Sequence, residues 1–318
     1  MTWKQRPEGG GRFAIWLIRC IAMYGGRGPA RLLLYPITLY FLIRRGPERR
    51  ASRAYLSRVL GRPAGLLDVA RHIHCFAATI LDRVFMLSER FRRFDIQAHG
   101  LDEVHALMDR GRGVLLLGSH HGSFEALRVL SLARPDAKVR VVLDKGQNPA
   151  MTQLLDALNP DIARGVIDAG QGGTSIVLQI QQAASEGALI GLLADRARPG
   201  EAAVDCTFLG APAPFPTAPI LIASALHIPV VLCFGLYRGG RRYDLHFEVF
   251  SEGLRIARKD RQATLAEHMQ RYASRLEHYV RLAPYNWFNF YDFWQNDARR
   301  HSGDNRGGAA GAGDGGEG

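Results

Sequence analysis

Apolar runs alternate with amphipathic segments over the middle of the chain. Six runs rich in valine, leucine and isoleucine are typical of strands, and they predict strands at residues 114–118, 139–143, 165–168, 188–193, 230–234 and 243–250. Helical spacing between these runs predicts helices at residues 124–133, 149–158, 175–184 and 218–226. Strands that alternate with helices predict an α/β fold, with a mixed, mostly parallel sheet flanked by helices.

Three segments give further detail on this fold. Residues 243–250 alternate strictly between polar and apolar, which predicts a strand near a sheet edge with one polar face. Residues 66–87 carry apolar side chains at spacings of three and four, which predicts a helix. The same spacing predicts a long amphipathic helix near the C-terminus, with a core-facing stripe of Leu265, Met269, Tyr272, Leu276 and Tyr279.

The N-terminal region has two apolar stretches, residues 13–24 and 32–43, which arginines interrupt or flank. Each has about a dozen residues, whereas about 20 are needed to span a bilayer. We therefore expect an amphipathic helical pair that lies in the membrane interface as a monotopic anchor or dips into it. Ordinary helices packed on the core are the alternative. No small-residue cleavage site follows, so a removable signal peptide is not expected.

These patterns divide the chain into a membrane-associated helical segment at residues 1–62, a main domain at residues 63–298 and a disordered glycine-rich tail at residues 299–318. The formal net charge of +11 suits an anionic membrane surface, an acidic protein or nucleic acid. Because no nucleic-acid-binding motif accompanies this charge, we do not expect nucleic acid as a partner.

The four cysteines are far apart in the sequence, without the spacing of a zinc site or a disulfide framework. Three of them lie in apolar stretches, where cysteine acts as a small buried side chain in a reducing compartment. His72 and His74 precede Cys75, but on a helix these two histidines point to different faces. No metal site is predicted there.

The candidate chemistry lies directly after the predicted strand 114–118. His120 ends the strand and Glu125 falls in the first turn of the next helix, where open α/β sheets place their catalytic residues. A carboxylate that holds one imidazole nitrogen leaves the other free to take a proton from a hydroxyl. The backbone N–H groups of Gly122 and Ser123 are candidates for binding an oxyanion. The alternative is a structural histidine, with Glu125 complementing the helix dipole.

This His-(four residues)-Glu motif resembles that of glycerolipid and lipid A acyltransferases, most closely the LpxL/HtrB-like lipid A biosynthesis-type branch, which reads His-x-Gly-Asn-Trp-Glu. A second block, from Asp195 through Phe208-Leu209-Gly210-Ala211-Pro212, resembles that branch in order and approximate spacing. Near the C-terminus, the branch reads Pro-x-Gln-Trp-x-Trp where this chain has Pro284-Tyr285-Asn286-Trp287-Phe288-Asn289. The likeness covers about residues 66–294. The chain lacks the Glu-Gly-Thr-Arg block of lysophosphatidate acyltransferases.

Arginines in the second block are candidate anion ligands. Arg196 and Arg198 follow the predicted strand 188–193 and offer a fork geometry that suits phosphate. Lys145, after the strand at 139–143, is a further candidate. The alternative is a solvated loop in which Asp195 pairs with neighbouring cations.

The resemblance implies an O-acyltransferase of the cell inner membrane, on its cytoplasmic face. It would move a fatty acyl chain from an acyl thioester, such as acyl carrier protein, to a hydroxyl of a membrane glycolipid or lysolipid. His120 would act as the general base and Glu125 would orient it, without a metal or organic cofactor. Two hypotheses compete with this one: a non-catalytic lipid carrier that retains the fold, and a basic nucleic-acid-binding protein.

Overall fold

The computed structural model describes residues 26–87, 93–125, 130, 134, 137–147, 149–197, 200–256 and 259–294. A seven-stranded sheet in the order β1-β9-β8-β2-β5-β3-β4 forms its centre. The strands are β1 Asp95–His99, β2 Val114–Gly118, β3 Val139–Leu143, β4 Val166–Asp168, β5 Leu189–Leu193, β8 Val230–Tyr237 and β9 Arg242–Ser251. Strands β8, β2, β5, β3 and β4 run parallel, whereas β9 runs antiparallel to β8. The predicted mixed, mostly parallel sheet is confirmed.

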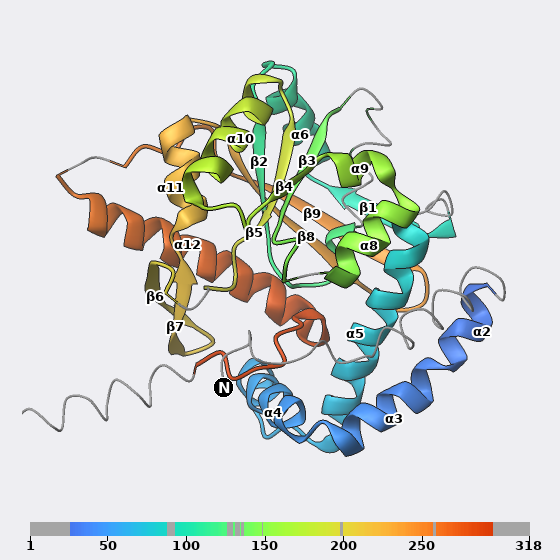
Figure 1. The fold of residues 1–318 in the computed structure, drawn as a ribbon. Helices are drawn as coiled ribbons and strands as arrows, with labels where there is room; N and C mark the ends of the chain where they lie inside the picture. The colour runs from blue at the N-terminus through green and yellow to red at the C-terminus, as the bar shows by residue number, and fades with distance from the viewer. Residues whose placement is uncertain are drawn as a thin grey trace, which may run out of the picture.

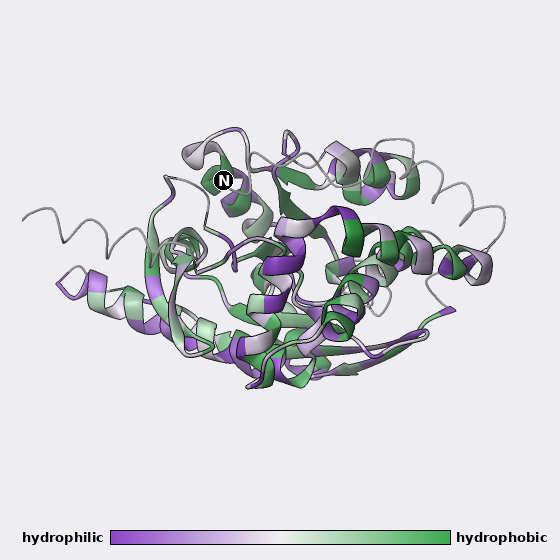
Figure 2. Ribbon diagram, turned by 90° about the horizontal axis from the view of Figure 1, so that it is seen from below, coloured by the Kyte–Doolittle hydropathy of each residue, from purple (hydrophilic) through white to green (hydrophobic). Residues whose placement is uncertain are grey.

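Helices cover both faces of the sheet (Figure 1). They are α2 Arg27–Leu32, α3 Leu34–Arg44, α4 Gly46–Leu60, α5 Leu66–Leu87, α6 Leu101–Met108, α8 Pro149–Leu158, α9 Pro160–Arg164, α10 Gly173–Ser185, α11 Ala218–Leu226 and α12 Arg261–Leu282. A 3-10 turn, η5 Pro284–Asn286, follows α12. Hydrophilic and hydrophobic residues alternate along these helices, as expected of amphipathic helices that pack on a sheet (Figure 2).

The alternation of side chains along β2 divides the core into two clusters. Leu115 and Leu117 face α10, α11 and α12, whereas Val114 and Leu116 face α6 and the C-terminal half of α5. The five apolar residues predicted to line α12 are all buried in the first cluster. β2 is buried along its whole length because both of its faces are covered, which explains its uninterrupted apolar sequence.

The predicted position of the strand at residues 243–250 is confirmed. This strand, β9, lies one place from the sheet edge, and β1 lies outside it. Its apolar residues Tyr243, Leu245 and Phe247 enter the core. Its polar residues face the other way, where Glu248 accepts a hydrogen bond from Arg275 of α12 at 2.7 Å.

Three of the described strands are absent from the sequence-based prediction: the edge strand β1 and a pair outside the main sheet. β6 Ala203–Phe208 and β7 Ala211–Pro216 form an antiparallel hairpin that packs against α12 (Figure 1). Prolines at positions 212, 214 and 216 gave this segment the pattern of a loop. They occupy alternate positions of β7, where a strand of a two-stranded ribbon can lack donors without losing its ladder.

The N-terminal helices pack on α5 and run antiparallel to it. Arg27 of α2 forms a bidentate contact with Asp82, with both N–O distances at 2.7 Å, and Thr38 of α3 contacts His74. No helix among the described residues is long and apolar enough to cross a bilayer. The apolar stretch at residues 13–24, the tail and most of the helix predicted at 124–133 lie outside the described residues.

The described cysteines agree with their predicted role. Cys75, Cys206 and Cys233 are free thiols, and all three are buried. His72 and His74 point to different sides of α5, as predicted: His72 is buried in the core, and His74 lies against Tyr35 of α3.

Candidate active site

A tight turn after β2 sets the position of His120. Gly122 has a φ of +74°, and a Cβ atom on it would lie 1.8 Å from the carbonyl oxygen of Gly235. Only glycine fits a left-handed conformation with so close a neighbour. The chain therefore turns sharply at the carboxyl end of the central strand β2, and His120 lies at the start of this turn.

His120 is held by Asp195, which follows β5. The imidazole Nδ1 lies 2.7 Å from Asp195 Oδ1, and the backbone N–H of His120 donates to the same oxygen at 3.1 Å. β2 and β5 are neighbours in a register that pairs Gly118 with Leu193. His120 and Asp195 each lie two positions beyond this pair. The parallel pairing of the two strands therefore brings them side by side at the carboxyl edge of the sheet.

Asp195 is fully buried and all of its acceptor positions are occupied. Its second oxygen, Oδ2, accepts hydrogen bonds from Trp287 Nε1 at 3.0 Å and from Asn289 Nδ2 at 3.2 Å. With the two bonds from His120, four donors surround the carboxylate. An ionised carboxylate offers about four lone-pair positions for such donors, and the charges of His120 and Arg196 hold the pKa of Asp195 well below its usual range. Asp195 is therefore an anion in this structure.

This arrangement fixes the tautomer of His120. Because Asp195 is an acceptor only, Nδ1 of His120 carries the hydrogen and Nε2 of a neutral imidazole is left as a base. The His120 side chain is 29% exposed, whereas Asp195 is 0% exposed. The buried carboxylate thus supports a histidine that substrate can reach.

Charges around the pair explain its protonation. Burial lowers the pKa of His120 below the usual value for histidine, and the positive charge of Arg196 lowers it further. The negative charge of Asp195 acts in the opposite direction, and Arg83 adds a smaller lowering effect. Burial by itself would raise the pKa of Asp195, but His120 and Arg196 hold it well below its usual range. A neutral histidine beside an ionised aspartate is the expected state at neutral pH.

The segment after η5 completes the site. Phe288 N donates to the carbonyl of His120 at 2.8 Å, and Gly122 N donates to the carbonyl of Asn286 at 2.8 Å. The segment is anchored in turn by His72, a buried histidine of α5, whose Nε2 lies 2.9 Å from Trp287 O. Burial lowers the pKa of His72 to about 4. Neutral His72 therefore donates through Nε2 and accepts from Ser52 Oγ through Nδ1 at 2.7 Å.

Glu125 does not hold His120 in this structure, contrary to the predicted pairing. Glu125 Oε1 lies 2.6 Å from Arg83 Nε of α5, and Glu125 Oε2 accepts a hydrogen bond from Ser123 Oγ at 3.0 Å. The spacing of four residues places Glu125 beyond the turn at Gly122, where it meets α5. Asp195, which follows the neighbouring strand β5, is the carboxylate that holds His120, in the role predicted for Glu125.

The backbone N–H groups of Gly122 and Ser123 were predicted to bind an oxyanion, and the structure gives them other partners. Gly122 N donates to Asn286 O, and Ser123 N donates to Gly235 O at 2.8 Å. These two hydrogen bonds join the turn to η5 and to β8. A substrate oxygen could reach these N–H groups only after the turn had separated from its neighbours.

Arg196 lies at the site, as the sequence indicated, but its fork is already occupied. Nε donates to Asn289 Oδ1 at 2.5 Å and Nη2 donates to Phe288 O at 2.8 Å. These two nitrogens form the side-on edge of the guanidinium that would otherwise grip a phosphate. Arg198 lies outside the described residues.

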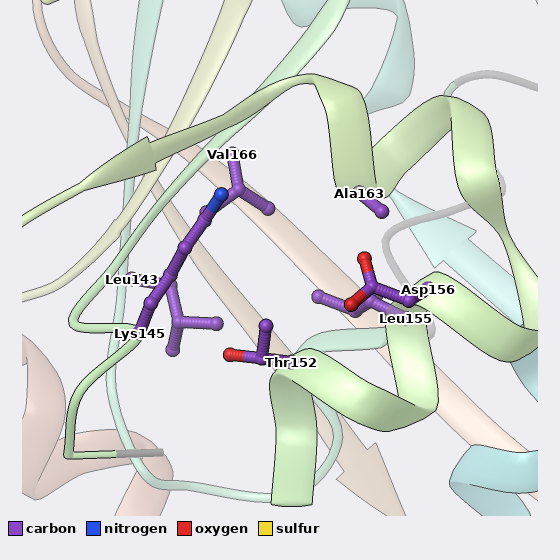
Figure 3. Close-up of a pocket in the computed structure, with 7 residues that line it drawn as sticks. All are labelled: Leu143, Lys145, Thr152, Leu155, Asp156, Ala163 and Val166. Carbon is purple, nitrogen blue, oxygen red and sulfur yellow. The ribbon is translucent and has the colours of Figure 1, made fainter. Parts of the chain in front are cut away.

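Lys145 lies elsewhere on the same edge of the sheet. It follows β3, two strands from β2, which corresponds to about 10 Å at the usual strand spacing. Its side chain borders a small pocket that Thr152 and Leu155 also line, and it extends towards Val166 (Figure 3). The structure therefore does not join Lys145 to His120. Within the described ranges, no group of three or more histidine, cysteine, aspartate or glutamate side chains is placed to hold a metal ion.

Comparison with known proteins places this geometry in a family. Residues 74–296 match the family of bacterial lipid A biosynthesis acyltransferases. The chain belongs to this family. The match spans α5 from residue 74 onwards, the whole sheet, α12 and the segment with Trp287 and Asn289, so the His120–Asp195 pair and its direct partners lie inside it, whereas His72 lies just before it. A comparison with curated proteins returned no match.

The roles of two residues of the candidate site escaped the sequence analysis. Asp195 was assigned to a charged loop, although its position after β5 matches that of His120 after β2. Trp287 entered the sequence analysis only through the resemblance near the C-terminus, yet this residue is 0% exposed and its indole donates to Asp195. The signal for Asp195 was available, because both strands are apolar runs followed at the same offset by a polar residue.

Proposed function

We propose that this protein transfers a fatty acyl chain from an acyl thioester to a hydroxyl of a membrane glycolipid or lysolipid. The observation that carries the proposal is the His120–Asp195 pair, in which a buried carboxylate orients an accessible imidazole. The chain's membership of the family of bacterial lipid A biosynthesis acyltransferases supports acyl transfer as the reaction class.

In the proposed reaction, His120 Nε2 takes the proton of the acceptor hydroxyl as its oxygen attacks the thioester carbonyl. The tetrahedral intermediate then expels the thiolate, which recovers the proton from His120. Asp195 stabilises the imidazolium between these two steps. No covalent acyl-enzyme is needed, since the acceptor oxygen attacks the thioester directly.

We assign the stabilisation of the oxyanion to the cations beside His120. Arg196 is bonded to Asn289, which also donates to Asp195, and Arg83 pairs with Glu125 after the turn; the charges of both arginines lower the pKa of His120. A fixed positive charge at that position favours the negative charge that develops on the thioester oxygen. Glu125 holds Arg83, and we propose that this is the role of the carboxylate in the His-(four residues)-Glu motif here.

Acyl carrier protein is the proposed donor. Its acidic surface would be attracted by a chain with a formal net charge of +11. The phosphate of its prosthetic arm needs a cationic ligand, and we keep Arg198 and Lys145 as the candidates that the sequence offers.

The same proposal places the protein at the cytoplasmic face of the inner membrane. Large apolar side chains are exposed along α2 and α3: Leu32, Tyr35, Leu39, Tyr40 and Ile43, each more than half exposed. Arg31 and Arg44 lie in the last turns of these two helices. An apolar face with flanking arginines suits insertion into the interface of an anionic bilayer.

Vesicle binding tests this membrane face. The double variant Leu39→Glu/Ile43→Glu should lose sedimentation with vesicles that contain phosphatidylglycerol. Leu178→Glu is the matched control, because Leu178 is 60% exposed on α10, at the opposite end of the molecule from α3 (Figure 1). Equal binding of both variants and the wild type would show that α3 does not form the membrane contact.

The reaction is tested with purified protein, a radiolabelled acyl thioester and a panel of lysolipids and glycolipid acceptors. Wild type should move the label into the lipid fraction, and His120→Ala should not. His121→Gln is the matched control, since His121 is the adjacent histidine but is buried, with Nε2 3.2 Å from Ala283 O. Equal transfer by wild type and His120→Ala would favour the carrier hypothesis.

A further inference from the structure

Asn289 joins the carboxylate and the cation of the site through a single amide. Its Nδ2 donates to Asp195 Oδ2 at 3.2 Å, while its Oδ1 accepts from Arg196 Nε at 2.5 Å. The side chain is 1% exposed. An amide in this position donates to one partner and accepts from the other. An aliphatic side chain of similar size can do neither, and a carboxylate can only accept.

The extended backbone of the C-terminal segment explains how Asn289 reaches these partners. Side chains two positions apart lie on the same face of an extended segment. Trp287 and Asn289 accordingly both donate to Asp195 Oδ2. Asn286 lies on the opposite face, where its amide bonds to the backbone of Tyr237 at 2.7 and 3.3 Å.

The amide of Asn289 also fixes the direction of Arg196. With Nε bound to Asn289 and Nη2 bound to Phe288 O, the side-on edge of the guanidinium faces the C-terminal segment. The carbon Cζ lies 5.8 Å from the centre of the Tyr291 ring. A guanidinium held by two hydrogen bonds and an aromatic ring keeps one orientation, so its charge stays at a fixed place relative to His120.

We propose that Asn289 is a positioning residue that couples Asp195 to Arg196, so that one amide sets both the orientation of the base His120 and the place of the neighbouring cation. This inference rests on the acyl-transfer function proposed above. The related pattern Pro-x-Gln-Trp-x-Trp carries tryptophan where this chain has Asn289. An indole donates but cannot accept, so it could serve Asp195 but not Arg196, and the coupling belongs to this chain's own sequence.

Two variants separate the parts of this role. Asn289→Leu has a similar volume and removes both hydrogen bonds. Asn289→Asp keeps the acceptor for Arg196, removes the donor to Asp195 and adds a negative charge beside it. Asn286→Ala is the matched control, because it removes a buried hydrogen-bonded amide from the same segment without touching Asp195.

The first readout is the titration of His120 by NMR in protein labelled at histidine, with the signal assigned from His120→Gln. The charged groups that face His120 are Asp195 and Arg196 from the loop after β5 and Arg83 from α5. Releasing Arg196 removes a nearby positive charge, so Asn289→Leu should raise the pKa of His120. Asn289→Asp keeps Arg196 in place but should also raise the pKa of His120, because it adds a negative charge. Asn286→Ala should leave it unchanged.

The second readout is the rate of acyl transfer. Both Asn289 variants should lower kcat by about 10- to 100-fold, as expected for lost hydrogen bonds to charged groups. Asn286→Ala should lower thermal stability without this loss of kcat. A His120 pKa that is the same in wild type and in both folded Asn289 variants would overturn the coupling. The titration needs no substrate, so a failure of the proposed function would show separately, as absence of transfer by the wild type.

Discussion

Replacing Asp195 with asparagine tests how the candidate base is oriented. The carboxylate accepts two hydrogen bonds from His120 on one oxygen, and one each from Trp287 and Asn289 on the other. An asparagine offers one acceptor and one donor group. If its oxygen faces His120, its amide meets the two donors Trp287 and Asn289. If it turns round, its amide forces His120 to carry the hydrogen on Nε2, where the base is needed.

Either orientation should be costly for catalysis. Leaving buried donors unpaired costs about 1–3 kcal/mol each, and a wrong histidine tautomer lowers kcat by about 10⁴-fold in Ser-His-Asp enzymes. We therefore expect Asp195→Asn to lower kcat by about 10³- to 10⁴-fold, which corresponds to about 4–5.5 kcal/mol of activation free energy. The assay is transfer from a labelled acyl thioester by protein whose fold is verified by circular dichroism.

Glu125→Gln provides the comparison that decides between the two carboxylates. In this structure Glu125 holds Arg83 and not His120, so its amide variant should lose less activity than Asp195→Asn. The reasoning is refuted if Asp195→Asn keeps kcat within tenfold of wild type while Glu125→Gln abolishes transfer. That result would return the role of orienting His120 to Glu125.

Further predictions concern stability and pH. Asp82→Ala removes a fully buried carboxylate that binds Arg27 and Tyr243, so it should lower the free energy of unfolding by about 3–5 kcal/mol in chemical denaturation, whereas Arg164→Ala, in an exposed pair, should change almost nothing. Burial lowers the pKa of His72 to about 4 and that of His121 to about 3. Between these values and the usual histidine pKa of about 6.5, only the unfolded chain binds the protons. The free energy of unfolding should therefore be constant just above pH 6.5 and should fall between pH 6.5 and 4, by up to about 3 kcal/mol for each histidine. Unfolding free energies that stay flat over this range would contradict the prediction. Since the pKa of His120 is lowered, kcat/KM should lose activity only below pH 6.5 on the acid side, and a midpoint above 7 would argue against His120 as the base.

Periodicity predicted six of the seven strands of the sheet, without β1, and neither strand of the separate hairpin. The apolar run that became β2 has the bounds expected from sequence, because a strand buried on both faces needs apolar residues throughout; β3 also has the expected bounds, although it is only half-buried. β7 was missed, since its prolines indicate a loop unless the partner strand is known. The apolar pattern of α3 likewise does not indicate which of its residues are buried and which are exposed.

The site was predictable up to the histidine and not beyond it. Local spacing favoured Glu125 as the partner of His120, because only five positions separate them. The observed partner, Asp195, lies 75 positions away and becomes a neighbour through the pairing of β2 with β5. Trp287 and Asn289 come from a third segment, after α12. Contacts of this kind depend on strand order and on the path of the C-terminal segment, neither of which the pattern of apolar residues specifies.

Lipid mass spectrometry tests the central claim most directly. Cells that express wild type or His120→Ala at matched protein levels would be compared for their complete membrane lipids. The account predicts a lipid in the wild-type cells that is one acyl chain heavier than its counterpart in the variant, which would identify acceptor and chain together. Identical lipids in the two cultures would contradict acyl transfer to a native lipid through His120.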